Sequence, residues 1–99
     1  IYIMKVVISP STNSKKKYMA VFTESNSFKK KTVHFGSAGM SDFTKNKDEE
    51  RKKRYLDRHR KNENWNDPTT AGALSRWVLW NKPTLRASIA DYKRRFKLK

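Results

Sequence analysis

The 99-residue chain contains no cysteine and only three glycines and three prolines. Without cysteine the chain has no disulfide, no zinc–thiolate site and no cysteine nucleophile, which fits a protein made in the reducing interior of a cell. No apolar run approaches the roughly 20 residues that span a bilayer. The opening segment IYIMKVVISP is too short and too regular for a signal peptide, and Met4 is a candidate translational start.

Acidic residues are also scarce, since nine Asp and Glu face 24 Lys and Arg and the net charge is +15. The excess is spread along the chain, with +7 in residues 1–47 and +8 in residues 48–99. Such a chain repels itself and favours polyanions or acidic protein surfaces. The candidate partners are therefore nucleic acid, an acidic coat or scaffold protein, and anionic lipid.

Large apolar residues are concentrated in residues 67–85, DPTTAGALSRWVLWNKPTL. We expect a central helix here, capped by Asp67, with Pro68 in its first turn. Asn81, as a left-handed cap, and Pro83 are expected to end it. We expect both Trp77 and Trp80 to be buried; the alternative is that Trp80 is exposed as an anchor for a partner.

Alternating apolar residues predict three short strands at residues 3–8, 18–22 and 31–35, joined as an antiparallel meander. Residues 36–44 are expected to form a plain connection pinned by Phe43, or a backbone nest for an anion. A charged helix is predicted over residues 48–61, and a last amphipathic helix after Thr84. The predicted core residues from the two later helices are Leu74, Trp77, Val78, Trp80, Leu85, Ile89, Tyr92 and Phe96.

The predicted fold is thus a single small α+β domain over residues 1–99, a three-stranded antiparallel β-meander followed by three α-helices. Its parts are the meander (1–36), a loop (37–47) and a helical part (48–99). We find no internal repeat and no domain boundary.

Basic residues fall into groups that could bind a polyanion or a partner. Arg51, Arg54, Arg58 and Lys61 recur at spacings of 3, 4 and 3, which places them in one stripe along a helix, with a solvated face partly paired to acids as the alternative. Two lysine triplets lie at opposite ends of the second strand, roughly 20 Å apart, where solvated edge charge is the alternative interpretation. The basic segment 93–99 suits a helix C-terminus, with fraying into a tail as the alternative. The predicted binding residues are Lys15, Lys16, Lys17, Lys29, Lys30, Lys31, Arg51, Arg54, Arg58, Lys61, Arg94 and Arg95.

Residue patterns for catalysis or metal binding are not evident in the sequence. The two histidines, His34 and His59, have no ligand-like spacing to other candidates. Ser75, His59 and Asp57 could be named as a triad, but no pattern places them together and GxSxG is absent. We therefore predict a non-enzymatic protein with no catalytic residues, no metal, no cofactor and no small-molecule substrate.

Several runs of the chain resemble a known family. These runs are HFGSAGMSDFT (34–44), KDEERKKRYLDRH (47–59), WNDPTTAGALSRWVLWNKPTL (65–85) and ASIADYKRRF (87–96). The chain resembles, from about Met4 onward, small basic proteins of large nucleocytoplasmic double-stranded DNA viruses, including those of algae and amoebae. That family has no settled biochemical activity, so no active site carries over. The resemblance implies a viral setting and a place in the virion.

Charge and resemblance together lead to two functional hypotheses. The first is a virion structural protein, a minor capsid or cement component that binds acidic surfaces of coat proteins. The alternative is a protein that contacts viral DNA through its phosphates. The dispersed lysines favour the first, because a DNA-binding protein is expected to gather its charge on one face, whereas the stripe of Arg51, Arg54, Arg58 and Lys61 favours the second.

Overall fold

A computed structural model describes residues 4–24 and 29–99. The strands β1 (Met4–Pro10), β2 (Lys16–Glu24) and β3 (Lys30–Ser37) form an antiparallel sheet in the order β1-β2-β3. Val6 pairs with Phe22, and Ala20 pairs with Val33. The predicted meander is confirmed. The strands extend beyond the apolar runs because backbone pairing continues into their polar ends, while residue 3 of the first predicted strand lies outside the described residues.

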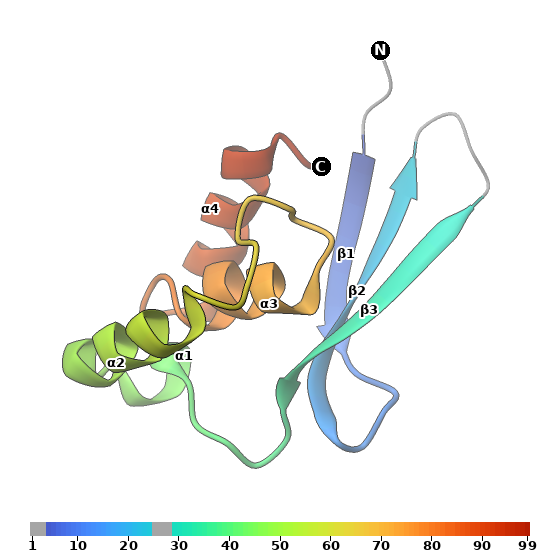
Figure 1. The fold of residues 1–99 in the computed structure, drawn as a ribbon. Helices are drawn as coiled ribbons and strands as arrows, with labels where there is room; N and C mark the ends of the chain where they lie inside the picture. The colour runs from blue at the N-terminus through green and yellow to red at the C-terminus, as the bar shows by residue number, and fades with distance from the viewer. Residues whose placement is uncertain (1–3, 25–28) are drawn as a thin grey trace.

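The helices lie together on one face of this sheet, which gives the molecule two layers (Figure 1). They are α1 (Phe43–Asn46), α2 (Glu49–His59), α3 (Ala71–Leu74), the π-helix η1 (Ser75–Leu79) and α4 (Leu85–Phe96). The predicted α+β class is therefore confirmed. The prediction of a loop throughout residues 37–47 is wrong, because Asp42 caps α1 through the Thr44 amide and Phe43 is buried.

The core lies between the sheet and the helices, and sheet and helices both contribute to it. Val6, Ala20, Phe22 and Phe35 face the helices from the sheet. The predicted core residues divide into two groups: Leu74, Val78, Trp80 and Tyr92 are buried, and Trp77, Leu85, Ile89 and Phe96 are half-buried against them. Trp80 is only 7% exposed, so the alternative that it is an exposed anchor is wrong.

The central helix begins later than predicted. Asp67 forms a local turn, in which its carboxylate accepts hydrogen bonds from the amide and hydroxyl of Thr69. Thr70 is the residue that caps the helix, accepting from the Ala73 amide, and α3 then continues directly into η1. Asp67 does not cap the helix because its carboxylate already binds Thr69, two residues further on. Local hydrogen bonds of this kind commonly compete with helix capping.

The predicted left-handed cap at Asn81 is also wrong. Asn81 is buried, and its side-chain amide donates to the Trp77 carbonyl and to Asp91. Cations satisfy the free carbonyls at the end of η1: Arg76 donates to the Trp80 carbonyl, and Lys52 donates to that of Asn81. The helix therefore ends by tertiary contacts rather than by a local cap.

The end of the chain is ordered against the sheet. Thr84 caps α4 as predicted, and Lys97 ends it in the left-handed conformation with φ of 55°. The Lys99 amide then donates to the Met4 carbonyl, and the Val6 amide donates to the Lys99 carbonyl. Figure 1 shows the C-terminus beside β1. The alternative of a frayed tail is wrong because these bonds cover the open edge of β1. Within the described ranges, no helix is long and apolar enough to cross a membrane.

Candidate anion-binding surfaces

A cleft of about 430 Å³ opens where α2 faces the end of β3 and the helix η1. We call it the α2 cleft. Its floor is aromatic and aliphatic, and its rim is basic. The floor residues are Phe35, Tyr55, Leu79 and Trp80, and the basic rim residues are Lys16, Arg51 and Arg58. A hollow of this size with an apolar floor and a few charged groups is typical of ligand sites.

Gly36 allows the end of β3 to approach η1 closely enough to close one side of the α2 cleft. Its φ is +78°, a conformation that other residues rarely adopt. A Cβ atom at this position would lie 2.8 Å from Leu79 Cδ1, which is closer than a normal contact. Any larger residue at position 36 is therefore expected to strain the backbone and to force the Leu79 side chain to shift.

One acid of the α2 cleft is neutralised by a buried ion pair. Asp42 Oδ2 lies 2.5 Å from Lys17 Nζ, and the two side chains are 2% and 8% exposed. Its other oxygen accepts from the amide and hydroxyl of Thr44. Lys17 is therefore a buried structural residue. The interpretations of Lys17 as a partner-binding lysine and as solvated edge charge are both wrong, because the chain folds an acid onto it from 25 positions away.

The second acid of the α2 cleft, Glu63, also has partners within the chain. Its carboxylate lies 2.9 Å from His59 Nδ1 and accepts a hydrogen bond of 2.9 Å from Trp65 Nε1. In contrast, Lys16, Arg51 and Arg58 form no ion pair with any acid of the described residues. The α2 cleft therefore carries an excess of positive charge that is available to a ligand.

Only half of the predicted arginine stripe reaches the α2 cleft. Arg51 and Arg58 lie two helical turns apart on the side of α2 that Tyr55 occupies. Arg54 and Lys61 are exposed and do not line the cleft. The predicted helix over residues 48–61 is too long, because α2 ends at His59 and Lys61 lies in the turn that follows. Of the predicted stripe, only Arg51, Arg54 and Arg58 are on the helix, and only Arg51 and Arg58 line the cleft.

Tyr55 closes the floor of the α2 cleft and is held on both faces. Its ring stacks on His59 at 4.1 Å and on Trp80 at 4.3 Å, measured between ring centroids. Burial raises the pKa of the Tyr55 hydroxyl to about 12, with a further contribution from the charge of Glu63. The hydroxyl therefore stays protonated at neutral pH, and both faces of the ring are already occupied.

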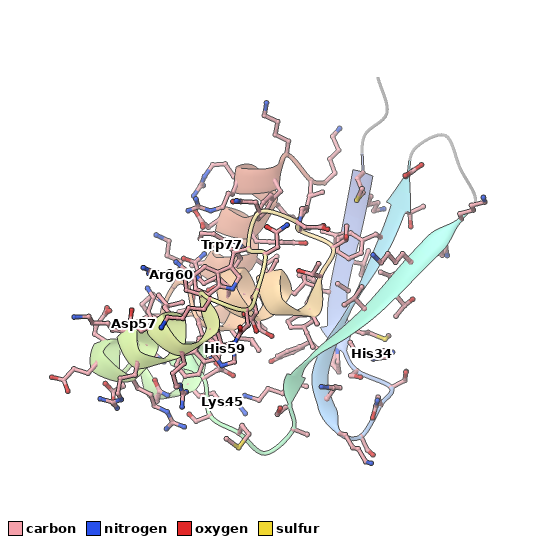
Figure 2. The ribbon with its side chains drawn as sticks, in the orientation of Figure 1. His34, Lys45, Asp57, His59, Arg60 and Trp77 are labelled. Atoms are coloured by element: carbon pink, nitrogen blue, oxygen red, sulfur yellow. The ribbon has the colours of Figure 1, made fainter. Side chains whose placement is uncertain are left out.

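The structure brings part of the named triad into the same cleft. Ser75 and His59 both line the α2 cleft. However, the acid that holds His59 is Glu63, while Asp57 is on the exposed side of α2 (Figure 2). Among the hydrogen bonds of the described residues, none joins Ser75 to His59. The Ser75–His59–Asp57 combination is therefore not assembled.

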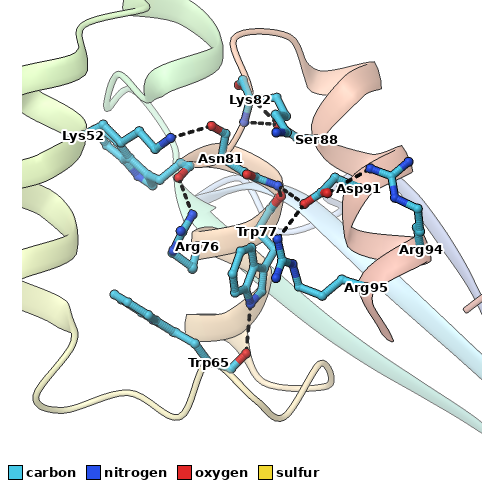
Figure 3. Close-up of polar contacts among 11 residues, drawn as sticks. Lys52, Trp65, Arg76, Trp77, Asn81, Lys82, Ser88, Asp91, Arg94 and Arg95 are labelled. Atoms are coloured by element: carbon cyan, nitrogen blue, oxygen red, sulfur yellow. Dashed lines mark hydrogen bonds and ion pairs between the residues drawn. The ribbon is translucent and has the colours of Figure 1, made fainter. Parts of the chain in front are cut away.

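A second basic surface consists of alternating arginine and tryptophan side chains, which we call the arginine–tryptophan stack. Its five members are Arg60, Trp65, Arg76, Trp77 and Arg95. The guanidinium of Arg76 lies 5.4 Å from the centre of Trp65 and 4.1 Å from that of Trp77. Arg95 lies 3.9 Å from Trp77, and Arg60 lies 6.0 Å from Trp65 (Figures 2 and 3). Each contact has the geometry of a cation–π interaction.

Arg76 is the inner cation of this stack. Its Nη1 donates to the Trp80 carbonyl at 2.8 Å, and its Nε is buried without a hydrogen-bond partner among the described residues. Burial lowers the pKa of Arg76, and the nearby charges of Arg95 and Arg60 lower it further. A guanidinium nevertheless stays charged at neutral pH. The stack therefore concentrates three positive charges around two indole rings.

Asp91 is the acid nearest to this positive charge. It accepts from Asn81 at 2.7 Å, from Arg94 at 3.0 Å and from Arg95 at 3.4 Å (Figure 3). The Asn81 hydrogen bond is the main cause that lowers the pKa of Asp91, and Arg94 and Arg95 add to it. Asp91 and Glu63, which binds Trp65 Nε1, are the two carboxylates among the described residues that contact members of the stack, and they leave the surface around its three arginines positive.

We expect Asp91→Asn to weaken the acid dependence of stability. The folded pKa of Asp91 lies below the ordinary 3.8, so its contribution is present above pH 3.8 and is lost as the pH falls through the folded value. The variant should be less stable than the wild type at neutral pH, and the difference should shrink as the pH falls below 3.8. Urea unfolding at a series of pH values measures this. Asp57→Asn, which changes an exposed acid, is the control. Parallel stability curves for wild type and Asp91→Asn would contradict the assignment.

The remaining predicted binding residues are distributed over the molecule. Lys15 is exposed in the turn before β2, and Arg94 is mostly exposed on α4. Lys29, Lys30 and Lys31 line a smaller hollow of about 270 Å³ at the other end of the sheet. The Lys31 ammonium donates to the Thr69 hydroxyl at 3.3 Å. Lys30 and Lys31 pair with the far end of β2, whereas Lys16 is at its start. This second lysine triplet is therefore separate from the α2 cleft, as the sequence predicts.

The nest predicted in residues 36–44 has at least three of its amides occupied, one of them the Thr44 amide that donates to Asp42. The Ala38 amide donates to the Lys15 carbonyl, and the Met40 amide donates to the Ser37 carbonyl. Both glycines of this loop have positive φ, as its tight course requires. Over residues 4–24 and 29–99, no group of three His, Asp or Glu side chains is arranged to hold a metal ion.

Comparison with known proteins places the chain in a family. Residues 6–59 match the model of a family described as a family of unknown function (DUF5754), and the chain belongs to this family. The matched residues run from β1 to the end of α2, so they include Lys16, Arg51 and Arg58. Searches of the curated proteins and of the solved structures found no match.

Proposed function

We propose that this protein is a non-enzymatic structural component of a virus particle, a minor capsid or cement protein that binds acidic surfaces of coat proteins. The observation that carries the proposal is that cations in excess of their acids form two separate surfaces. These surfaces are the α2 cleft and the arginine–tryptophan stack. A protein that joins neighbouring coat proteins needs contact surfaces of this kind in more than one place.

The two surfaces use different residues of η1. Ser75 and Leu79 line the α2 cleft, while Arg76 and Trp77 belong to the arginine–tryptophan stack and do not line the cleft. Two acidic partners could therefore be held at the same time, one on each surface.

The composition and the viral resemblance support the same proposal. A net charge of +15 makes association with acidic surfaces favourable and salt-dependent. The resemblance to small basic proteins of large double-stranded DNA viruses supplies the setting, in which the protein is made in the infected cell and packaged in the particle. The basic residues, rather than a catalytic group, are the groups that we propose to act.

The test is the position of the protein in purified particles of the virus that encodes it. Particles are opened, the shell is separated from the DNA, and the protein is quantified by mass spectrometry in each fraction. We expect many copies in the shell fraction and their release at high salt, since the screening length falls from about 10 Å at 0.1 M to about 3 Å at 1 M. Absence from the particles would reject the proposal.

Rebinding to salt-stripped shells connects this test to the two surfaces. Arg60→Gln/Arg95→Gln in the arginine–tryptophan stack and Arg51→Gln/Arg58→Gln in the α2 cleft should each weaken rebinding. Lys45→Gln/Lys53→Gln removes the same charge from exposed positions and is the matched control. Equal loss in all three variants would show that only net charge matters.

DNA binding is the outcome that would replace this proposal. If Arg51, Arg54, Arg58 and Lys61 contacted phosphates of duplex DNA, the log–log salt slope of binding would be about −3.6. The protein would then be found with the genome rather than with the shell. Such a result would assign the charge to phosphates and would reject the coat-protein role.

A further inference from the structure

The α2 cleft has a charge pattern that is more specific than general basicity. Both of its acids are tied to partners inside the chain, Asp42 to Lys17 and Glu63 to His59 and Trp65. Its three remaining cations, Lys16, Arg51 and Arg58, have no acid of their own among the described residues. Asp42 and Glu63 therefore do not compete with an anionic ligand for these three cations.

The spacing of the two arginines restricts the shape of the ligand. Arg51 and Arg58 are seven residues apart on α2, so their positions on the helix are separated by about 10 Å at 1.5 Å per residue. A peptide in the extended polyproline II conformation advances about 3.1 Å per residue and makes one turn every three residues. Two carboxylates three residues apart would therefore lie on one face, about 9 Å apart. They would match the two guanidiniums, since guanidinium pairs well with carboxylate in two-pronged hydrogen bonds.

The accessible apolar surface of the α2 cleft indicates what accompanies those carboxylates. Phe35 and Leu79 are buried, with 1% and 2% exposure, whereas Met40 lines the cleft and is 58% exposed. An apolar side chain placed between two acids would pack on Met40 while its acidic neighbours meet the basic rim. The volume of about 430 Å³ suits a short peptide segment.

The same floor is poorly suited to a nucleic-acid base. Proteins that bind single strands commonly stack bases on open aromatic faces. Tyr55 is already covered by His59 on one face and by Trp80 on the other, and Trp80 is itself only 7% exposed. The α2 cleft thus offers positive charge and the exposed side chain of Met40, without an open stacking platform.

We infer that the α2 cleft binds an extended acidic segment of a partner protein, with two carboxylates on Arg51 and Arg58 and an apolar side chain against Met40. This inference rests on the proposed function, because it names the part of an acidic coat protein that the cleft recognises. Lys16 contributes a third positive charge from the opposite side, at the start of β2.

A synthetic peptide tests the inference directly. The probe is a fluorescein-labelled peptide with the core Glu-Leu-Ser-Glu between glycine flanks, titrated with the full-length protein and followed by fluorescence anisotropy. Arg51→Gln/Arg58→Gln is expected to lose at least about tenfold in affinity, because each arginine faces a carboxylate in a partly desolvated site. The control Lys45→Gln/Lys53→Gln should change affinity by less than about threefold, as expected for exposed charges.

Variant peptides test the two chemical features of the segment. Replacing both glutamates by glutamine should abolish binding, and replacing the leucine by serine should weaken it several-fold. Thermal melting of each protein variant checks that folding is retained, which we expect because both arginines are at least partly exposed. Equal binding to Arg51→Gln/Arg58→Gln and to the control variant would overturn the inference, as would binding that ignores the leucine.

Two outcomes separate this inference from the proposed function. A single-stranded oligonucleotide that binds more tightly than the peptide, and that loses affinity in Arg51→Gln/Arg58→Gln, would assign the cleft to nucleic acid and overturn the inference. Peptide binding as described, combined with absence of the protein from virus shells, would support the cleft assignment while rejecting the structural role in the particle.

Discussion

Asp42→Ala is expected to lower the free energy of unfolding by about 3–5 kcal/mol, because it leaves the ammonium of Lys17 buried without its partner. Lys17 and Asp42 are 8% and 2% exposed, so water cannot replace the lost carboxylate without opening the structure. The substitution also removes the cap of α1, since Asp42 accepts from the amide and hydroxyl of Thr44. Both losses act on the segment that closes one side of the α2 cleft.

Urea unfolding of a small variant set measures this effect. Asp57→Ala, which removes an exposed acid, is the control and should change stability by less than about 0.5 kcal/mol. Lys17→Met/Asp42→Asn removes both charges while it keeps a side chain able to cap α1, and it should recover much of the loss. If Asp42→Ala unfolded at the same urea concentration as Asp57→Ala, the ion pair between Lys17 and Asp42 would make no contribution to stability.

Trp77→Ala is expected to cost a similar amount, about 3–5 kcal/mol. The indole of Trp77 separates the guanidiniums of Arg76 and Arg95, contacts the edge of Phe96, and donates to the Trp65 carbonyl at 2.9 Å. Its removal would leave a cavity and would bring two like charges face to face. Part of the cost should therefore be electrostatic and should decrease as salt is added.

A second substitution in the Trp77→Ala background isolates that electrostatic part. Arg95→Gln removes one of the two facing charges and should restore part of the stability. Arg94→Gln is the matched control, because Arg94 also binds Asp91 but does not stack on Trp77. Equal effects of the two substitutions would mean that the indole acts only by filling space, and an unchanged melting temperature for Trp77→Ala would reject its packing role altogether.

The elements with local signals could be predicted from the sequence. Alternation of apolar residues indicates the three strands, and the stripe of Leu85, Ile89, Tyr92 and Phe96 after Thr84 indicates α4. Asp48, Glu49 and Glu50 indicate the start of α2 in the same way, since Asp48 accepts from two amides of the first turn. Each of these signals lies within a few residues of the feature it predicts.

The two ends of the central helix could not be predicted in this way. Asp67 and Asn81 have the residue types of caps, but their side chains bind elsewhere, Asp67 to Thr69 and Asn81 to Asp91. A polar side chain near a helix end has several partners within reach, and only the folded chain decides among them. The change from α3 to the π-helix η1 likewise has no cue that we recognise in the sequence.

The candidate site shows the same division. The sequence indicated that Arg51 and Arg58 share a helix flank, but it contained no sign that Lys16 faces them or that Lys17 pairs with Asp42. Helix and strand periodicity relates only residues that are close in the sequence, so it does not predict contacts between charges that are distant in the sequence. The pairing depends on how the sheet and the helices pack. The sequence alone therefore does not distinguish a lysine that is paired with an acid from one that is available to a partner.

The arginine–tryptophan stack was missed for a related reason. Its members come from the end of α2, the following loop, η1 and α4, and no spacing connects them. The one available signal was the presence of Trp65 and Trp77 in a chain rich in arginine, because indole rings are the best partners of guanidinium groups. That signal does not say which arginines take part.

By itself, the sequence determined the α+β class, the antiparallel meander, the last helix and the strongly positive charge, because each depends on residues that are neighbours along the chain or on composition alone. The tertiary structure decided which cations are buried, which are stacked and which are left for a ligand. Neutralisation is a matter of distances of about 3–4 Å between side chains, and residues as far apart in the chain as Lys17 and Asp42 reach such distances only when the sheet and the helices have packed.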